Sequence, residues 1–135
     1  ADAWEALVAL DALYGRARYA LAARCSDAEL SPAREGWRIR EGRHPLLLAQ
    51  GVAVVPFDLA MDATERTLLV SGPNTGGKTV LLKALALIAL MMQCGIPAPV
   101  GQETVVPVFD DVFADIGDEQ SLEASLSTFS AHLKH

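Results

Sequence analysis

The sequence predicts an α/β fold, and three features indicate it. Apolar residues recur at helical spacing over residues 2–24, and a nearly continuous apolar segment of helical length covers residues 80–93. Short apolar runs with the composition of strands lie between and after these segments. One run, residues 67–71, leads through a glycine-rich loop directly into the second helical segment. Strands that alternate with helices are typical of α/β domains.

The composition indicates one folded unit. The chain has 135 residues, of which 51% are hydrophobic and 21% are charged, and its formal net charge is −6. A chain of this length buries roughly two-thirds of the surface that its unfolded form exposes, so we expect one hydrophobic core rather than two. This composition excludes a disordered, collagen-like or disulfide-stapled protein.

The charges are unevenly distributed along the chain. Residues 1–83 hold ten basic and ten acidic residues, whereas residues 84–135 hold one basic and seven acidic residues. This balance lacks the basic surface that is typical of nucleic-acid-binding proteins, so we expect the main contact with any DNA or RNA to lie elsewhere. A local basic cluster surrounds Trp37 and is either a small nucleic-acid contact or a solvated connector. Its members are Arg34, Arg38, Arg40 and Arg43.

The cysteines and the longest apolar run indicate the cellular compartment of the protein. Cys25 and Cys94 lie far apart, match no metal-ligand spacing and follow no signal peptide, which predicts reduced thiols and a cytoplasmic protein. The longest apolar run, residues 80–92, is interrupted by Lys83 and is shorter than the roughly 20 residues that cross a membrane. We therefore expect a core helix and no membrane contact.

The first third of the chain predicts a helix and then a connector. Residues 2–24 form an amphipathic pattern, for which we expect a broad buried stripe. Residues 26–45 contain prolines and glycines between charged residues and are expected to form a connector or short irregular strands. We place a domain boundary near Glu41.

The rest of the chain predicts strands around one buried helix. Short strands are expected over residues 46–48 and 52–55, and residues 67–71 are the candidate central strand. A helix that is apolar nearly all round follows at residues 80–93, and residues 105–116 supply further strand material.

The loop between the candidate central strand and the buried helix carries the most specific pattern. Its sequence, Gly72-Pro73-Asn74-Thr75-Gly76-Gly77-Lys78-Thr79, fits the phosphate-loop pattern G-x-x-x-x-G-K-[ST]. Gly72 lets the backbone turn out of the strand, and Gly76 and Gly77 let the backbone approach phosphate oxygens without a Cβ in the way. The backbone amides of residues 75–79 can then point at the anion.

The two residues that end this pattern predict the chemistry. The Lys78 ammonium is expected to reach the β- and γ-phosphates, and the Thr79 hydroxyl to bind Mg²⁺. The positive end of the helix dipole adds to the attraction. The pattern thus predicts a site for ATP or ADP with Mg²⁺, with catalytic roles for Lys78 and Thr79. The alternative is a glycine turn that binds no ligand.

Hydrolysis also needs an apolar strand that ends in Asp, in order to organise Mg²⁺ and water. Residues 105–111 are the candidate, because they end in Asp110 and Asp111. Pro107 removes a hydrogen-bond donor from the middle of this segment. We favour an ordinary polar strand end here.

Several segments together resemble a known family. The loop at residues 72–79 resembles the Walker A loop of MutS proteins, and Gly42-Arg43-His44-Pro45-Leu46 is similar to the entry to a MutS ATPase domain. The segment Phe113-Ala114-Asp115-Ile116-Gly117-Asp118-Glu119-Gln120-Ser121, followed by Ser127-Thr128-Phe129-Ser130, resembles the type-two MutS branch. These segments cover residues 42–132.

The resemblance implies a P-loop ATPase of the ABC-like class. Residues 41–135 would be the N-terminal half of the ATPase domain, without its Walker B part, and residues 1–40 the end of an all-α core domain with its connector. It implies a homodimer in which Ser127 of one subunit reaches the γ-phosphate of the other; the alternative for Ser127 is a plain helix cap. In relatives an aromatic residue stacks on adenine. That residue lies three positions before an Asn, and the aligned positions here are Val54 for the aromatic residue and Phe57 for the Asn. Adenine stacking by Phe57 is therefore a hypothesis, and the alternative is a core role for this ring.

For the complete parent dimer, the resemblance implies ATP hydrolysis coupled to the binding of branched DNA, which suppresses homologous recombination. The alternative is an ATPase that acts on stalled or collided ribosomes and binds rRNA. Members of this branch carry a nuclease domain and work in the bacterial cytosol or nucleoid. Two further alternatives are a small nucleotide kinase or GTPase and a nucleotide-sensing scaffold without turnover. No Asn-Lys-x-Asp guanine reader occurs in the sequence.

Overall fold

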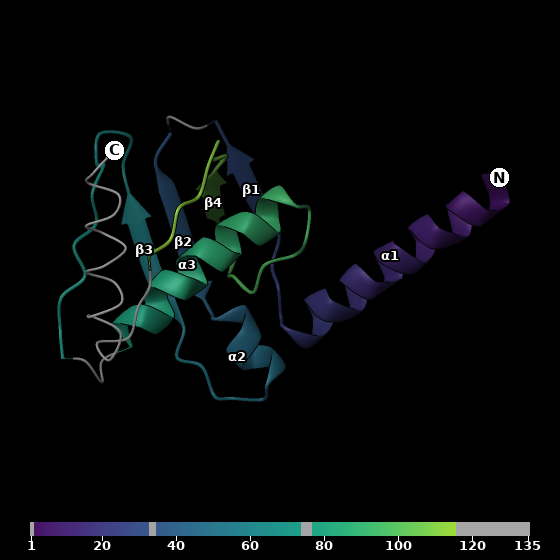
Figure 1. The fold of residues 1–135 in the computed structure, drawn as a ribbon, viewed down its shortest axis with the longest axis horizontal. Coiled ribbons are helices and arrows are strands. Elements are labelled where there is room, and N and C mark those ends of the chain that lie inside the picture. Colours follow the sequence, from purple (N-terminus) through teal and green to yellow (C-terminus); the bar gives the residue numbers. More distant parts are fainter. Residues whose placement is uncertain (1, 33–34, 74–76, 116–135) are drawn as a thin grey trace, which may run out of the picture.

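The computed structural model describes residues 2–32, 35–73 and 77–115 (Figure 1). These residues confirm a mixed α/β fold. Its elements in chain order are α1 (Asp2–Ala22), β1 (Ala28–Ser31), β2 (Trp37–Gly42), α2 (Pro45–Ala49), β3 (Phe57–Met61), α3 (Lys78–Gln93) and β4 (Thr104–Pro107). Ser127 lies outside the described residues.

The four strands form one mixed sheet in the order β1-β4-β2-β3. Strand β4 runs parallel to β1 and antiparallel to β2, which in turn is antiparallel to β3. Strands β1 and β2 are the short strands expected within residues 26–45. The expected boundary between residues 1–40 and 41–135 falls inside β2, and this division stays a prediction.

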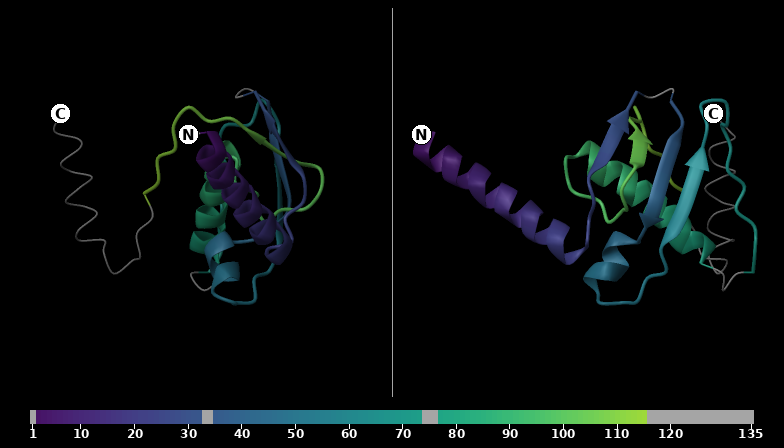
Figure 2. Two further views of the ribbon diagram at one scale, coloured as in Figure 1. Left: turned by 90° about the vertical axis from the view of Figure 1, so that its right-hand side faces the viewer. Right: turned by 180° about the vertical axis from the view of Figure 1, so that it is seen from behind.

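Helix α3 packs across one face of the sheet and forms the core with it (Figures 1 and 2). Ile88 on the helix is fully buried, as are Ile39 on β2 and Val106 on β4. The outer side of α3 is not buried, in contrast to the helix buried nearly all round that the sequence predicted. Leu82 and Leu90 on this side are 45% and 43% exposed. Within the described ranges, no helix is long and apolar enough to cross a bilayer.

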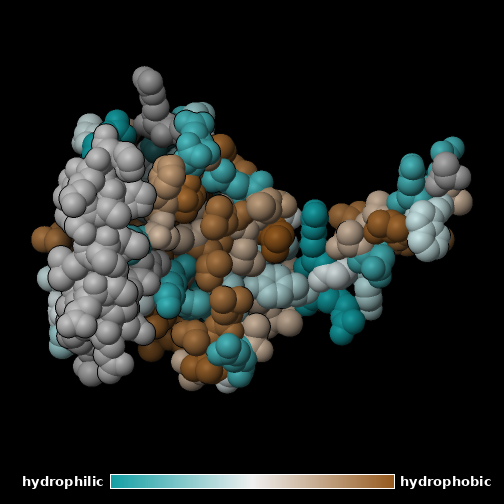
Figure 3. Space-filling view, viewed as in Figure 1, coloured by the Kyte–Doolittle hydropathy of each residue, from teal (hydrophilic) through white to brown (hydrophobic). Residues whose placement is uncertain are grey.

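Helix α1 projects away from the sheet, and it contradicts the expected buried stripe (Figures 1 and 2). No residue of α1 is buried, and Trp4 and Leu21 are 73% and 82% exposed. Apolar side chains are visible along this helix in Figure 3. The amphipathic pattern of α1 therefore has no partner among the described residues. The turn after the helix is held to the sheet region, because Arg43 Nη2 donates to the Arg24 carbonyl at 2.7 Å.

Three predicted strands are wrong. Residues 46–48 lie in helix α2, because Pro45 suits the first turn of a helix and His44 caps its start. Residues 52–55 precede β3 without pairing, and residues 67–71 are not a strand. A strand exists only through hydrogen bonds to a neighbour, and no described strand lies beside residues 67–71, where Leu69 is 88% exposed.

The strand expected over residues 105–116 is shorter than predicted, because β4 ends at Pro107. Beyond this point the Val108 amide still donates to the Ser31 carbonyl at 3.0 Å, and the Gln93 side chain then binds the backbone of Phe109. The Gln93 side chain accepts from the Phe109 amide at 3.1 Å and donates to the Phe109 carbonyl at 2.9 Å. The Phe109 ring meets Trp37 edge to face, with ring centroids 5.7 Å apart. These contacts hold Phe109 against α3 and β2, although this residue is not part of a strand.

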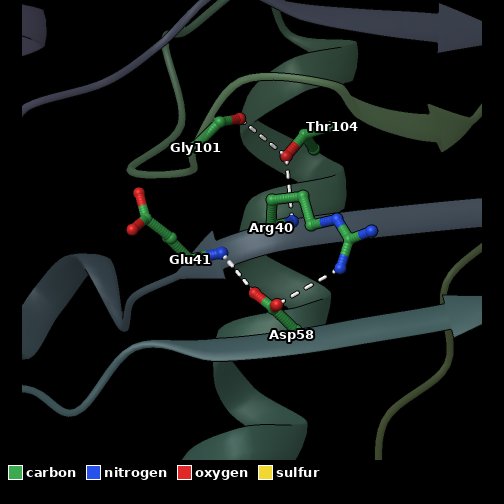
Figure 4. A network of polar contacts seen from close by, with 5 residues as sticks. All are labelled: Arg40, Glu41, Asp58, Gly101 and Thr104. Atoms are coloured by element: carbon green, nitrogen blue, oxygen red, sulfur yellow. Dashed lines mark hydrogen bonds and ion pairs between the residues drawn. The ribbon is translucent and has the colours of Figure 1, made fainter.

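A polar network holds β2 to both of its neighbours where the register of β2 and β3 shifts (Figure 4). The Thr104 hydroxyl donates to the Gly101 carbonyl at 2.8 Å and accepts from the Arg40 amide at 3.1 Å. Asp58 accepts from the Glu41 amide at 2.8 Å and pairs with the Arg40 guanidinium at 3.3 Å. The Glu41 amide holds the pKa of the Asp58 carboxyl below its ordinary value of 3.8, with Arg40 adding to the effect.

We predict that Thr104→Val destabilises the fold. Thr104 is 1% exposed, and valine has the same shape but leaves the Arg40 amide and the Gly101 carbonyl without a partner. The expected loss is about 1–3 kcal/mol in the free energy of unfolding, measured by urea denaturation. Thr104→Ser keeps the hydroxyl and is the matched control, with an expected loss below about 1 kcal/mol. Equal stability of the valine variant and the native chain would contradict the role of this network.

Candidate nucleotide-binding site

A cavity of about 600 Å³ lies at the start of α3. Part of its wall is the glycine-rich loop, which contributes Gly72, Pro73, Gly77 and Lys78. The rest is mostly apolar and comes from His44 and Leu47, from residues 53–57, from residues 70–71 before the loop and from the first turns of α3. The structure therefore brings the predicted loop and Phe57 to one cavity.

Two described glycines of the loop, Gly72 and Gly77, adopt positive φ. Gly72 has a φ of 149° and Gly77 a φ of 78°, a region that side-chain-bearing residues rarely adopt. A Cβ at either position would meet no atom within 4 Å, so the requirement for glycine is conformational. Gly77 is the N-cap of α3 and has no side chain to accept from the first amides of the helix. Asn74, Thr75 and Gly76 lie outside the described residues.

Lys78 is the first residue of α3, and its side chain folds back over the loop. Its ammonium donates to the carbonyl oxygen of Gly72 and, at 3.0 Å, to that of Pro73. Thr79 follows in the same turn, half-buried and outside the cavity wall. The lysine is thus at the wall between the loop and the cavity, where an anion could compete for its hydrogen bonds.

Gly42 leaves space for the Phe57 ring in the cavity wall. The two residues pair across β2 and β3, and a Cβ at Gly42 would lie 2.7 Å from the Phe57 ring. Glycine therefore makes room for the ring. Phe57 packs partly against the core cluster and also lines the cavity beside Val54. The stacking and core hypotheses are both compatible with this position.

His44 also lines the cavity, and reasoning from the residues did not single it out as a site residue. Its side chain is 6% exposed, and its Nδ1 accepts from the Leu47 amide at 3.4 Å to cap α2. Burial lowers the pKa of His44 below its ordinary value of 6.5; a hydrogen bond with the backbone of His44 acts in the opposite direction, and the positive charge of Lys83 lowers the pKa further. The only signal in the sequence was its place in the segment Gly42-Arg43-His44-Pro45-Leu46.

Comparison with known proteins identifies the family. A family model described as MutS domain V matches residues 68–135. The chain belongs to the MutS domain V family. The match covers the glycine-rich loop and α3, whereas α2 and Phe57 precede it. The MutS domain V model therefore accounts for only part of the cavity wall.

Relatives of this MutS domain V chain cover almost all of it. The endonuclease MutS2 of Gemmatimonas aurantiaca is 66% identical over 133 residues, which are 98% of this chain and 16% of the relative. Those of Shouchella clausii and Pelotomaculum thermopropionicum are 47% and 49% identical over 129 and 134 residues. These alignments cover 96% and 97% of the chain and 16% of each relative. The chain thus spans about 16% of the length of these relatives.

The arginines near Trp37 do not form a basic surface among the described residues. Arg40 pairs with Asp58, and Arg43 is bonded to two backbone carbonyls. Arg38 lines a hollow of about 270 Å³ that three carboxylates share. These are Asp27, Glu29 and Glu103. The arrangement favours a solvated surface over a nucleic-acid contact; Arg34 lies outside the described residues.

Asp110 and Asp111 do not line the cavity at the start of α3. Both are exposed beyond the end of β4. Asp111 lines a separate cavity of about 240 Å³ beside Trp37 and Leu85, and neither aspartate lines the cavity at the loop. This placement favours the polar strand end over a hydrolytic carboxylate.

We predict that the stability of the chain falls between about pH 7.5 and about pH 5.5 because of His44. The pKa of His44 is lowered in the folded state, so the unfolded chain binds the proton more readily and acid favours unfolding. The carboxyls of Asp58 and Asp62, whose pKa values lie below 3.8, contribute only at lower pH.

His44→Asn is the matched variant, because its side-chain oxygen can cap α2 but has no proton to bind in this range. Thermal unfolding of both proteins across this range provides the test. We expect a flatter pH profile for the variant, and an unchanged profile would exclude His44 as the source.

Proposed function

We propose that the cavity at the start of α3 binds ATP or ADP and that the chain is part of an ABC-like ATPase. The observation that carries the proposal is the shared cavity wall of Lys78, the loop glycines and Phe57. Membership of the MutS domain V family supports it. The nucleotide would lie with its phosphates at the loop and its base toward the apolar wall.

The loop supplies positive potential for the phosphates. Among the described residues the ammonium of Lys78 is bonded to two neutral carbonyls, and phosphate oxygens bind an ammonium more strongly than such carbonyls because they are charged. The amides at the start of α3 have no side-chain acceptor and would donate to the same phosphates. The apolar wall around Phe57 and Val54 would exclude water from the base and offer a ring to stack on it.

Mg²⁺ would be held by the nucleotide together with Thr79, which lies in the first turn of α3 beside the cavity wall but is not part of it. The described residues contain no group of three His, Cys, Asp or Glu side chains that could hold a metal ion. Mg²⁺ usually combines a few protein oxygens with phosphate oxygens and water, so the hydroxyl of Thr79 would be its ligand from this chain. The ion would supply neutralisation of charge on the phosphates.

Hydrolysis would depend on residues beyond the described part of the chain. No Asp or Glu lines the cavity, so its described wall offers no carboxylate to orient the attacking water. We propose that the complete parent protein is a homodimer in which Ser127 of one subunit reaches the γ-phosphate of the other. Under this proposal, residues 1–40 end a helical core domain, and residues 41–135 begin the ATPase domain.

We propose that the parent protein couples this ATPase to branched DNA and suppresses recombination in the bacterial cytosol or nucleoid. The relatives named endonuclease MutS2 support a nuclease activity for the parent. Action on stalled ribosomes, with rRNA binding, is the alternative. The carboxylates around Arg38 and Arg40 indicate that contacts with nucleic acid lie mainly outside the described residues.

We predict that Lys78→Ala weakens ATP binding about tenfold or more, because a charge-assisted contact with the phosphates is lost. Calorimetric titration with Mg-ATP measures the change. Arg66→Ala is the matched control, since Arg66 is an exposed cation that does not line the cavity. We expect the control to bind ATP within about twofold of the native chain. Unchanged binding by the Lys78 variant would overturn the proposal.

We predict that Ser127→Ala leaves ATP binding by one chain unchanged but reduces self-association in the presence of ATP. The hydroxyl removed would have contacted the nucleotide of the other chain. Sedimentation velocity with and without Mg-ATP measures the association, and Ser125→Ala is the control from the same segment. Normal ATP-dependent association of the Ser127 variant would count against its role across the dimer.

A further inference from the structure

His44 presents a hydrogen-bond donor at the cavity wall. Nδ1 accepts from the Leu47 amide at 3.4 Å, so we assign the proton of the neutral ring to Nε2. The ring is held by this bond, by the turn of α2 and by its burial at 6% exposure. The cavity wall therefore includes a donor with a fixed direction rather than a freely rotating side chain.

The donor has no partner within the described residues. No hydrogen bond to Nε2 occurs there, whereas Nδ1 is bonded. Among the described residues, the buried side-chain polar atoms that lack a hydrogen-bond partner are Tyr19 Oη and Ser31 Oγ. Nε2 of His44 also lacks a partner there but is not among them, so it is not fully buried. Nε2 thus reaches open space, and the space that His44 lines is the cavity.

We propose that Nε2–H of His44 donates a hydrogen bond to the nucleoside part of the bound nucleotide. The inference rests on the proposed function, since it takes the cavity to be the ATP site. It assigns to His44 a role in recognising the nucleoside, beyond the phosphate contacts of the loop.

The surroundings of His44 favour an uncharged acceptor. Burial and the nearby Lys83 charge keep the pKa of the imidazole low, so the ring donates as a neutral group. A phosphate would favour the protonated ring, which this environment disfavours. The cavity residues contributed by α2 and by the segment before β3 are largely apolar, among them Leu47, Val54 and Phe57. A ring nitrogen of the base or a ribose hydroxyl is the acceptor that fits a neutral donor there.

Two substitutions of His44 separate its role as a donor at Nε2 from its role as the cap of α2. His44→Asn retains an acceptor near the position of Nδ1 and can cap α2, but it cannot reach the position of Nε2. His44→Gln places an amide nitrogen near the position of Nε2 but loses the cap. The proposal therefore predicts opposite outcomes: the Asn variant should fold normally and bind ATP less well, and the Gln variant should bind ATP but unfold at a lower temperature.

Calorimetric titration of the native chain and both variants with Mg-ATP and with magnesium tripolyphosphate tests the proposal. We expect His44→Asn to weaken ATP binding about three- to tenfold, the range for one neutral hydrogen bond, and to leave tripolyphosphate binding unchanged. His44→Gln should stay within about twofold of the native affinity for ATP.

Equal ATP affinity of the Asn variant and the native chain would overturn the inference and leave the proposed function standing. An equal loss for ATP and tripolyphosphate would also overturn it, since the contact would then be to the phosphates. Failure of the native chain to bind ATP, or unchanged binding by Lys78→Ala, would instead overturn the proposed function and the inference with it.

Discussion

The packing of α3 against one face of the sheet is the interaction on which the rest of the structure depends. Ile88 in the middle of the helix is fully buried in a cluster with Ile39 and Val106, which belong to two neighbouring strands. Burying a side chain of this size stabilises a fold by roughly 1.5–3 kcal/mol. Because Lys78 is the first residue of the same rigid helix, this packing also determines where the glycine-rich loop ends.

The second part of the cavity wall depends on the irregular pairing of β2 and β3. Within the register shift between Ile39 and Gly42, Asp58 on β3 accepts from the Glu41 amide. On the other side of β2, Thr104 on β4 accepts from the Arg40 amide. Gly42 then leaves room for the Phe57 ring, and the chain turns into α2 two residues later. A polar network on the sheet therefore positions an apolar wall at the cavity.

The loop and its helix could be predicted from the sequence because their requirements are local. Gly77 adopts positive φ, and the residues after it, mostly Leu, Ala, Met and Lys, have a high intrinsic helix propensity. The strands were predicted less well because strands need partners. Residues 67–71 have strand composition but no described neighbour, and residues 46–48 follow a capping histidine and a proline, which favour a helix.

The site shows the same division between local and distant requirements. The roles expected for Gly72 and Lys78 followed from their spacing, whereas His44 became visible only when folding placed it at the wall. The buried stripe predicted for α1 failed because an amphipathic pattern shows that a helix can be buried, not what buries it. Arg40 likewise formed an ion pair with Asp58, which is distant in the sequence.

Hydrogen–deuterium exchange of the chain with and without Mg-ATP tests most directly whether one nucleotide contacts both parts of the wall. We expect ATP to slow amide exchange in residues 77–81 at the start of α3 and, together with them, in residues 44–57. Slower exchange in the first segment alone would mean that the cavity holds only phosphate. No change in either segment would contradict the account.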